Sequence, residues 1–377
     1  MQLVAYGAQD VYLTGNPQIT FFKVVYRRHT NFACEAIEQT FNGTPAFGGK
    51  ATVPITRNGD LVTNMWLHTT VNNTHATETA DMLNEPGYSM IKSVELQIGG
   101  TKIDKHYGRW MQLWGDLSRP ANQDTNHTAL VGDGTTSIAV TNGSLELFVP
   151  LQFFCCRNDG LALPLIALQY HDVRLEFDFS AAASIASSGT NVSISNTTLL
   201  VNYIYLDSEE RKRFAQASHE YLIEQLQFTG VETVTVNSNN KVRLNFNHPV
   251  KELIWAVQAD TWGLYDDNTT AGLNSTSDAL LQLNGHDRFS KESGAFFNYV
   301  QTQTHHSRTP SAGINVYSFA LNPEEHQPSG TCNFSRIDNA TLSVTTTADS
   351  GTSMYVYGVN YNVLRVMSGM GGVAYSN

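Results

Sequence analysis

The sequence predicts an all-β protein with two consecutive antiparallel units. Eight-stranded jelly rolls with short helices in their connections are the favoured fold, because this fold tolerates long loops. Charged residues make up only 15% of the 377 residues, while Asn, Ser, Thr and Gly are abundant, which favours sheets and turns. Similar landmarks also recur in the same order on both sides of a charged stretch near the middle of the chain.

The length allows two domains of ordinary size. A formal net charge of −11 argues against nucleic acid as a direct partner, because phosphate binding needs a basic surface. The first residues lack the basic start and unbroken apolar run of a signal peptide, so synthesis in the cytosol is expected. The sequence also has no apolar window long enough to predict a membrane span.

Residues 1–29 are expected to form an N-terminal arm. Thr14-Gly15-Asn16-Pro17 is a turn signal, and the segment that follows mixes apolar side chains with Lys23, Arg27, Arg28 and His29. Docking of this segment on its own domain is the favoured interpretation. Contact with an anionic partner inside an assembly is the alternative.

The first unit is expected to span residues 30–207. A buried strand is predicted around Met65–Leu67, and Val94–Ile98 leads into Gly99-Gly100, a two-residue hairpin signal. The spacing of Tyr107, Trp110, Leu113 and Trp114 predicts a short amphipathic helix that closes one end of the unit.

The segment HDVRLEFDF gives the clearest strand pattern in the chain. Its apolar residues alternate with charged ones, so they are expected to share one buried face: Val173, Leu175, Phe177 and Phe179. A further strand, Leu199–Leu206, closes the first unit.

A helical strap is predicted over residues 208–220. Ser208, Glu209 and Glu210 resemble a helix start, and Phe214, Ala217 and Tyr221 have the spacing of one apolar stripe. Alternation typical of a strand begins only after Glu224. We expect the strap to clamp the two units together, with Phe214 and Tyr221 in the seam, so that Phe214→Ala lowers the melting temperature clearly and Lys212→Ala barely changes it.

The second unit, residues 221–377, is expected to repeat the order of the first. Val234 and Val236 are predicted to form a hairpin with the strand at Val242, Leu244 and Phe246, through Asn237–Asn240. The remaining landmarks have counterparts in the first unit: Pro249–Trp255 for Leu61–Trp66, Leu281–Gly285 for Leu96–Gly100, Phe296, Phe297 and Tyr299 for Tyr107 and Trp110, and Met354–Tyr357 for Asn202–Tyr205.

The four cysteines, Cys34, Cys155, Cys156 and Cys332, show no metal-binding spacing. Cys155 and Cys156 lie in an apolar run and are expected to point to opposite faces of one strand. We predict that all four are reduced thiols.

No catalytic, cofactor-binding or metal-binding residue is predicted, and the protein is not expected to be an enzyme. His305 and His306 are adjacent, and neighbouring side chains of a strand diverge. Glu324-Glu325-His326 has the composition of a surface loop. Asp260, Asp266 and Asp267 could supply carboxylates for sugar chemistry, but their Gly- and Asn-rich setting favours turns.

Four stretches resemble the double jelly-roll major capsid proteins of nucleocytoplasmic large DNA viruses and related smaller eukaryotic DNA viruses. They are LVAYGAQDVYLTGNPQITFFKVVYRRHTNFA, VELQIGGTKID, PLIALQYHDVRLEFDF and DSEERKRFAQASHEYLIEQL. The resemblance covers nearly the whole chain. It implies two side-by-side jelly rolls, a homotrimeric capsomer of six-fold outline and an icosahedral shell, without a cofactor.

The resemblance also implies where the protein acts and what it contacts. The location would be the virion, after synthesis in the host cytoplasm. Neighbouring capsomers, minor capsid proteins and penton proteins would be partners, and the N-terminal arm would lie near an internal membrane or minor capsid proteins. The alternative function is that of a carbohydrate-binding or hydrolytic jelly-roll protein, with Trp255 and Trp262 as a sugar platform.

Overall fold

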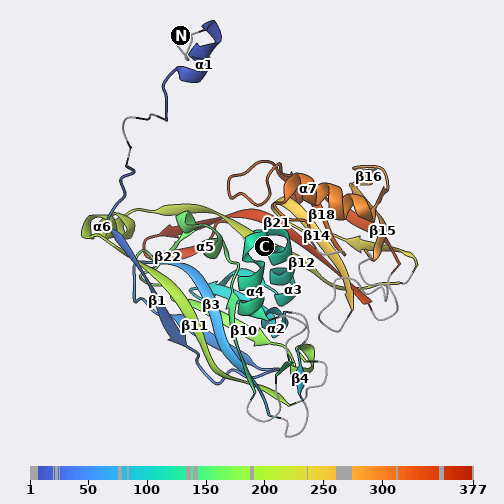
Figure 1. Ribbon diagram of the computed structural model, residues 1–377, viewed down its shortest axis with the longest axis horizontal. Helices are drawn as coiled ribbons and strands as arrows, with labels where there is room; N and C mark the ends of the chain where they lie inside the picture. The colour runs from blue at the N-terminus through green and yellow to red at the C-terminus, as the bar shows by residue number, and fades with distance from the viewer. Residues whose placement is uncertain are drawn as a thin grey trace.

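The structure is a computed structural model. It describes residues 7–19, 21, 24, 26–74, 79–82, 85–132, 137–138, 143–186, 191–235, 237–259, 274–310, 313–347 and 352–375. Two jelly rolls stand side by side, with helices between them and an arm that extends from the body at the N-terminus (Figure 1).

The first roll consists of two antiparallel sheets, which confirms the predicted fold for this half. The strand order is β1-β11-β3-β8 in one sheet and β2-β10-β5-β6 in the other, with β9 beside β3 and a separate pair β4-β7. The strands are β1 (Phe32–Thr40), β2 (Lys50–Ile55), β3 (Leu61–Asn73), β4 (Ala80–Asp81), β5 (Ile91–Ile98), β6 (Thr101–His106), β7 (Ser137–Ile138), β8 (Ser144–Pro150), β9 (Leu163–Pro164), β10 (Val173–Phe179) and β11 (Val192–Leu206).

The second roll repeats the order of the eight strands in the two main sheets. Its sheets run β12-β21-β14-β18 and β13-β20-β15-β16, and β19 lies beside β14 as β9 lies beside β3. The strands are β12 (His219–Thr233), β13 (Asn239–Arg243), β14 (Pro249–Ala259), β15 (Thr276–Leu283), β16 (His286–Asp287), β17 (Glu292–Ser293), β18 (Ile314–Ser318), β19 (Cys332–Asn333), β20 (Ala340–Thr346), β21 (Thr352–Met367) and β22 (Met370–Val373).

Short helices fill the connections. The longest, α3, has Trp110 and Leu113 fully buried, as its sequence spacing predicts. A π-helix, η5, followed by α7 stands at the matching place in the second roll. The helices are η1 (Ala8–Asp10), α1 (Val11–Thr14), α2 (Pro86–Ser89), α3 (Gly108–Ser118), η2 (Ala121–Gln123), α4 (Asp124–Val131), α5 (Phe154–Arg157), η3 (Asp159–Leu161), η4 (Ala182–Ser184), α6 (Ser208–Gln216), η5 (Phe296–Val300), α7 (Gln301–His305) and η6 (Phe334–Arg336).

The two predicted tight turns are present. Gly99 and Gly100 have φ of 58° and 79°, and Asn284 and Gly285 have φ of 52° and 79°. Positive φ at both central residues matches the right-handed twist of the flanking strands, and Gly and Asn adopt it at low cost. The turns set the registers Ile98↔Thr101 and Leu283↔His286.

The alternation in β10 is confirmed, but the hairpin predicted at Asn237–Asn240 is wrong. Phe177 is fully buried and Arg174 is exposed. The segment after β12 instead crosses between sheets, because β12 pairs with β21 and β13 pairs with β20. Val236 lies outside the described residues.

The strap prediction needs correction. Helix α6 ends at Gln216, and β12 begins at His219, so Tyr221 belongs to a strand. No residue of α6 is buried, and the helix lies at the outer end of the molecule, where the arm joins the body (Figure 1). Phe214 therefore does not fill the seam, and its ring stacks on His219 at a centroid distance of 5.2 Å.

Because Phe214 is only half-buried, Phe214→Ala is expected to cost about 1 kcal/mol of unfolding free energy. Lys212→Ala should cost less. Phe177→Ala, in the core, is the positive control and should cost about 3–5 kcal/mol. Thermal unfolding of the three variants measures the difference. If Phe214→Ala lowers the unfolding free energy as much as Phe177→Ala does, the strap does clamp the two rolls together.

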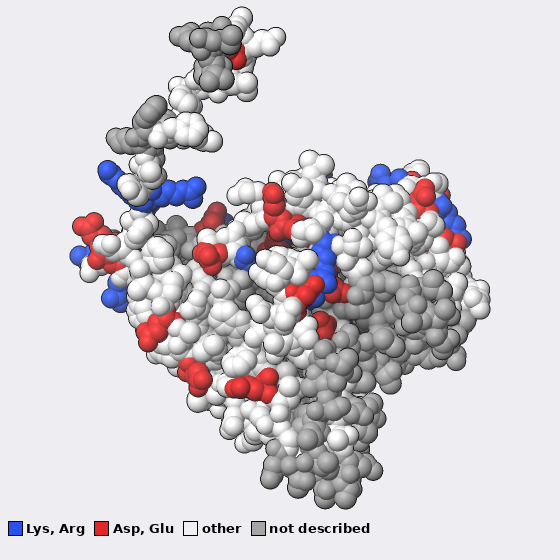
Figure 2. Space-filling model, viewed as in Figure 1, with Lys and Arg blue, Asp and Glu red and all other residues white. Residues whose placement is uncertain are grey.

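The arm does not dock on its own domain, contrary to the favoured expectation. Its described apolar side chains stay in solvent, with Tyr12 91%, Phe21 96% and Tyr26 83% exposed. Figure 2 shows basic side chains gathered where the arm meets the body, and Arg27 and Arg28 are exposed in this segment. Lys23 lies outside the described residues.

Candidate functional site

The seam between the rolls combines apolar packing with buried ion pairs. It forms because the sheet β12-β21-β14-β18 is buried on both faces. Leu253 and Trp255 point into the core of the second roll, whereas Ile254 and Tyr357 join the core of the first roll. Trp110 of α3 packs against Tyr357 at a ring distance of 5.5 Å. Apolar contact thus fixes one roll against the other.

A buried ion network crosses the same seam. The Glu224 carboxylate of β12 lies 2.7 Å from Lys251 Nζ of β14 and 2.9 Å from Arg157 Nη1 of the first roll. The side chain of Lys251 is 0% exposed, and its ammonium group also donates to the Pro323 carbonyl oxygen. The Arg157 guanidinium stacks 4.2 Å above the Trp114 ring. Each buried charge in this network therefore has an opposite charge or an acceptor.

Two further ionic contacts lie nearby. His306 is held between Glu252, at 3.2 Å, and Glu324, at 3.0 Å. Burial alone would lower the pKa of His306, but the two carboxylates outweigh burial and raise the pKa to about 9. Asp124 of α4 accepts hydrogen bonds from Arg308 of the second roll and from Arg119, and these bonds lower the pKa of its carboxyl group.

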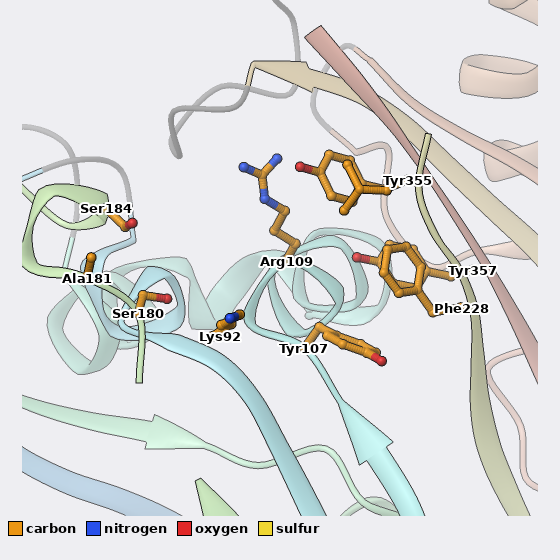
Figure 3. A pocket seen from close by; sticks show the side chains of 10 residues that line it. Lys92, Tyr107, Arg109, Ser180, Ala181, Ser184, Phe228, Tyr355 and Tyr357 are labelled. Atoms are coloured by element: carbon orange, nitrogen blue, oxygen red, sulfur yellow. The ribbon is translucent and has the colours of Figure 1, made fainter. Parts of the chain in front are cut away.

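A cavity of about 350 Å³ opens beside the seam (Figure 3). Aromatic side chains from the second roll, including Tyr355, Tyr357 and Phe228, form one wall. Arg109 of α3 reaches toward Tyr355, and its guanidinium carbon lies 4.3 Å from the centre of that ring. Lys92 and Ser180 belong to the opposite side.

The residues weighed from sequence do not assemble into a catalytic centre. His306 caps a helix rather than lying in a strand, and Glu324 lies in a loop as expected. Trp255 is 0% exposed against Phe297, so it cannot form half of a sugar platform. Asp260, Trp262, Asp266 and Asp267 lie outside the described residues.

Across the described part of the chain, no group of three or more His, Cys, Asp or Glu side chains is placed to hold a metal ion. The helices described are also too short or too polar to cross a membrane.

All four cysteines are free. Cys155 and Cys156 lie in helix α5 rather than in a strand, with their sulphur atoms 3.9 Å apart. Cys155 is buried, and Cys34 is exposed on β1.

Comparison with known proteins places this fold in one family. Residues 210–372 match the family described as large eukaryotic DNA virus major capsid protein, and residues 20–207 match the major capsid protein N-terminus. The major capsid protein of Pyramimonas orientalis virus is 52% identical over 404 residues, covering 100% of this chain and 99% of that protein. That of Paramecium bursaria Chlorella virus 1 is 43% identical over 436 residues, with the same coverage.

Solved structures agree. The crystal structure of PBCV-1 VP54 superposes with a TM-score of 0.85 at 40% identity, covering 95% of this chain and 100% of that one. The Faustovirus major capsid protein, at 14% identity and a TM-score of 0.76, shares the fold.

Two rolls of matching strand order joined by a packed seam define a double jelly-roll capsid protein. The chain belongs to the family of major capsid proteins of large eukaryotic DNA viruses. It forms the icosahedral capsid, is a component of the virion and is not an enzyme.

Proposed function

We propose that three copies of this chain form a trimer of nearly hexagonal outline, and that this capsomer is the tile of the shell. The observation that carries the proposal is the match between the two rolls in the order of the eight strands of their main sheets. A shell of mostly six-coordinated tiles needs six similar edges, and three copies with two similar rolls each supply them in a closed ring.

The seam within one chain suggests how neighbouring copies meet. Within the chain, α3 of the first roll packs on the outer face of the sheet β12-β21-β14-β18. Its counterpart in the second roll, η5, leaves Tyr299 53% and Val300 49% exposed. The outer face of the first roll's matching sheet, with Trp66 and Leu200 half-buried, would receive η5 of the next copy.

Size exclusion coupled to light scattering tests this proposal. The expected mass is three times 41.6 kDa and persists on dilution. Val300→Glu places a charge in the proposed contact and should yield monomers. Leu13→Glu, on the exposed arm, is the matched control and should remain trimeric. A wild-type chain that runs as a stable monomer would refute the proposal.

We also propose the division of the chain: an arm over residues 1–29, a first roll over 30–207, a connecting helix α6, and a second roll that begins with β12 at His219. The exposed apolar side chains of the arm suit contact with an internal membrane or minor capsid proteins beneath the shell. Neighbouring capsomers and penton proteins complete the proposed partners. The net charge of −11 supports the absence of direct contact with nucleic acid.

A further inference from the structure

Two hollows beside the seam form one elongated groove. The cavity of about 350 Å³ shares Tyr107 and Phe228 with a second hollow of about 230 Å³. The second hollow is lined by β6 and β12, each the edge strand of its sheet. The two strands are already joined by hydrogen bonds from Gln225 to the Ile103 carbonyl oxygen and from the Leu226 backbone to Asp104, so an occupant would be held by side chains. The elongated shape suits an extended chain better than a compact molecule.

The groove is positively charged on a protein of net charge −11. Lys92, Arg109, Lys102 and Lys105 line it. In the part of the chain that the structure describes, no carboxylate lies within ion-pair distance of the three lysines. Asp104 also lines the groove, but it is 3% exposed and is engaged by His106 and the Leu226 backbone. Lys92, Lys102 and Lys105 therefore remain available to an acidic partner.

The floor of the groove is aromatic. Tyr107 and Phe228 lie 4.9 Å apart, Phe228 and Tyr357 lie 4.8 Å apart, and Lys105 sits 5.7 Å above the Tyr107 ring. Burial raises the pKa of the Tyr107 hydroxyl, with smaller contributions from the Asp104 and Glu95 carboxylates, so this hydroxyl stays protonated and can donate a hydrogen bond. This combination can hold a flat side chain and a carboxylate side by side.

We propose that this seam groove binds an extended acidic peptide segment with aromatic side chains, supplied by another protein. The chain's own arm does not fit, because it carries Lys23, Arg27 and Arg28 against one acid, Asp10. Single-stranded nucleic acid fits less well, because it carries a charge at every phosphate and the net charge of the protein is −11, which opposes a fully charged backbone more than a peptide with a few carboxylates.

The test is a fluorescence-anisotropy titration of the full-length protein with a short fluorescein-labelled peptide that alternates glutamate and tyrosine. The same peptide with glutamine for glutamate should bind about tenfold more weakly. The triple variant Lys92→Gln, Lys102→Gln, Lys105→Gln should also weaken binding about tenfold, as expected for loss of three partly exposed ion pairs.

The matched control is Lys212→Gln, Lys241→Gln, Arg243→Gln, which removes the same charge from exposed positions outside the groove. It should bind the peptide like the wild type, and matching melting temperatures show that both triple variants fold. Equal weakening in the two triple variants, no binding by the wild type, or tighter binding of oligothymidylate with displacement of the peptide would each overturn the proposal.

Discussion

Replacing Glu224 with alanine is expected to lower the free energy of unfolding by about 3–5 kcal/mol, because it leaves a buried cation without its partner. Lys251 is 0% exposed, and without Glu224 its ammonium group would keep only the Pro323 carbonyl as an acceptor. Arg157 would retain its stacking on Trp114 but would lose its carboxylate. The seam should loosen, since Arg157 belongs to the first roll and Glu224 to the second.

The chain supplies a matched control on the same strand. Glu220 pairs with Arg365 at 2.8 Å, but both side chains are more than half exposed, at 59% and 51%. Glu220→Ala should therefore cost less than about 1 kcal/mol. Urea unfolding at one fixed protein concentration measures both variants, because subunit association would otherwise shift apparent stability. If Glu224→Ala lowers the free energy of unfolding no more than Glu220→Ala does, the buried ion network makes no net contribution to stability.

The sequence predicted features whose cause is local. Asn284-Gly285 and Gly99-Gly100 favour positive φ wherever they occur, so the turns follow from two residues each. The alternation of Val173 to Phe179 likewise needs only a buried face and a solvated face. Because the same landmarks recur in the second half of the chain, the fold predicted for one unit could be predicted for both.

The boundary between α6 and β12 could not be predicted in this way. The spacing of Phe214, Ala217 and Tyr221 fits a helix, and the strand begins at His219 because that residue pairs with Val366, far along the chain. Cys155 and Cys156 fall in α5 for a similar reason, since a short apolar run is compatible with either a helix or a strand.

The seam between the two rolls was the main feature that the sequence did not predict. Arg157, Glu224 and Lys251 are separated by 67 and 27 positions, and no pattern within any one segment connects them. One signal was available: Leu253–Val257 is apolar at every position, which indicates a strand buried on both faces rather than one. Such a strand requires a second layer, and the first roll is that layer.

The stability of the protein is expected to fall as pH rises through about 9, with His306 as the cause. In the folded state the pKa of His306 is raised from 6.5 to about 9, because Glu252 and Glu324 outweigh the effect of burial. A raised pKa contributes stability that is fully present below about pH 6.5 and is lost as the pH passes 9. The shift corresponds to about 3 kcal/mol.

The reference for this measurement is the double variant His306→Gln, Glu252→Gln, which removes both charges of the fully buried pair and so avoids leaving a lone carboxylate. Between about pH 6 and pH 10, the wild type should lose about 3 kcal/mol more than the double variant in urea unfolding. His305→Gln changes the neighbouring, partly buried histidine, whose Nδ1 lies 2.9 Å from the Leu321 carbonyl oxygen, and this variant should follow the wild-type curve. Parallel curves for the wild type and the double variant would show that folding does not raise the pKa of His306.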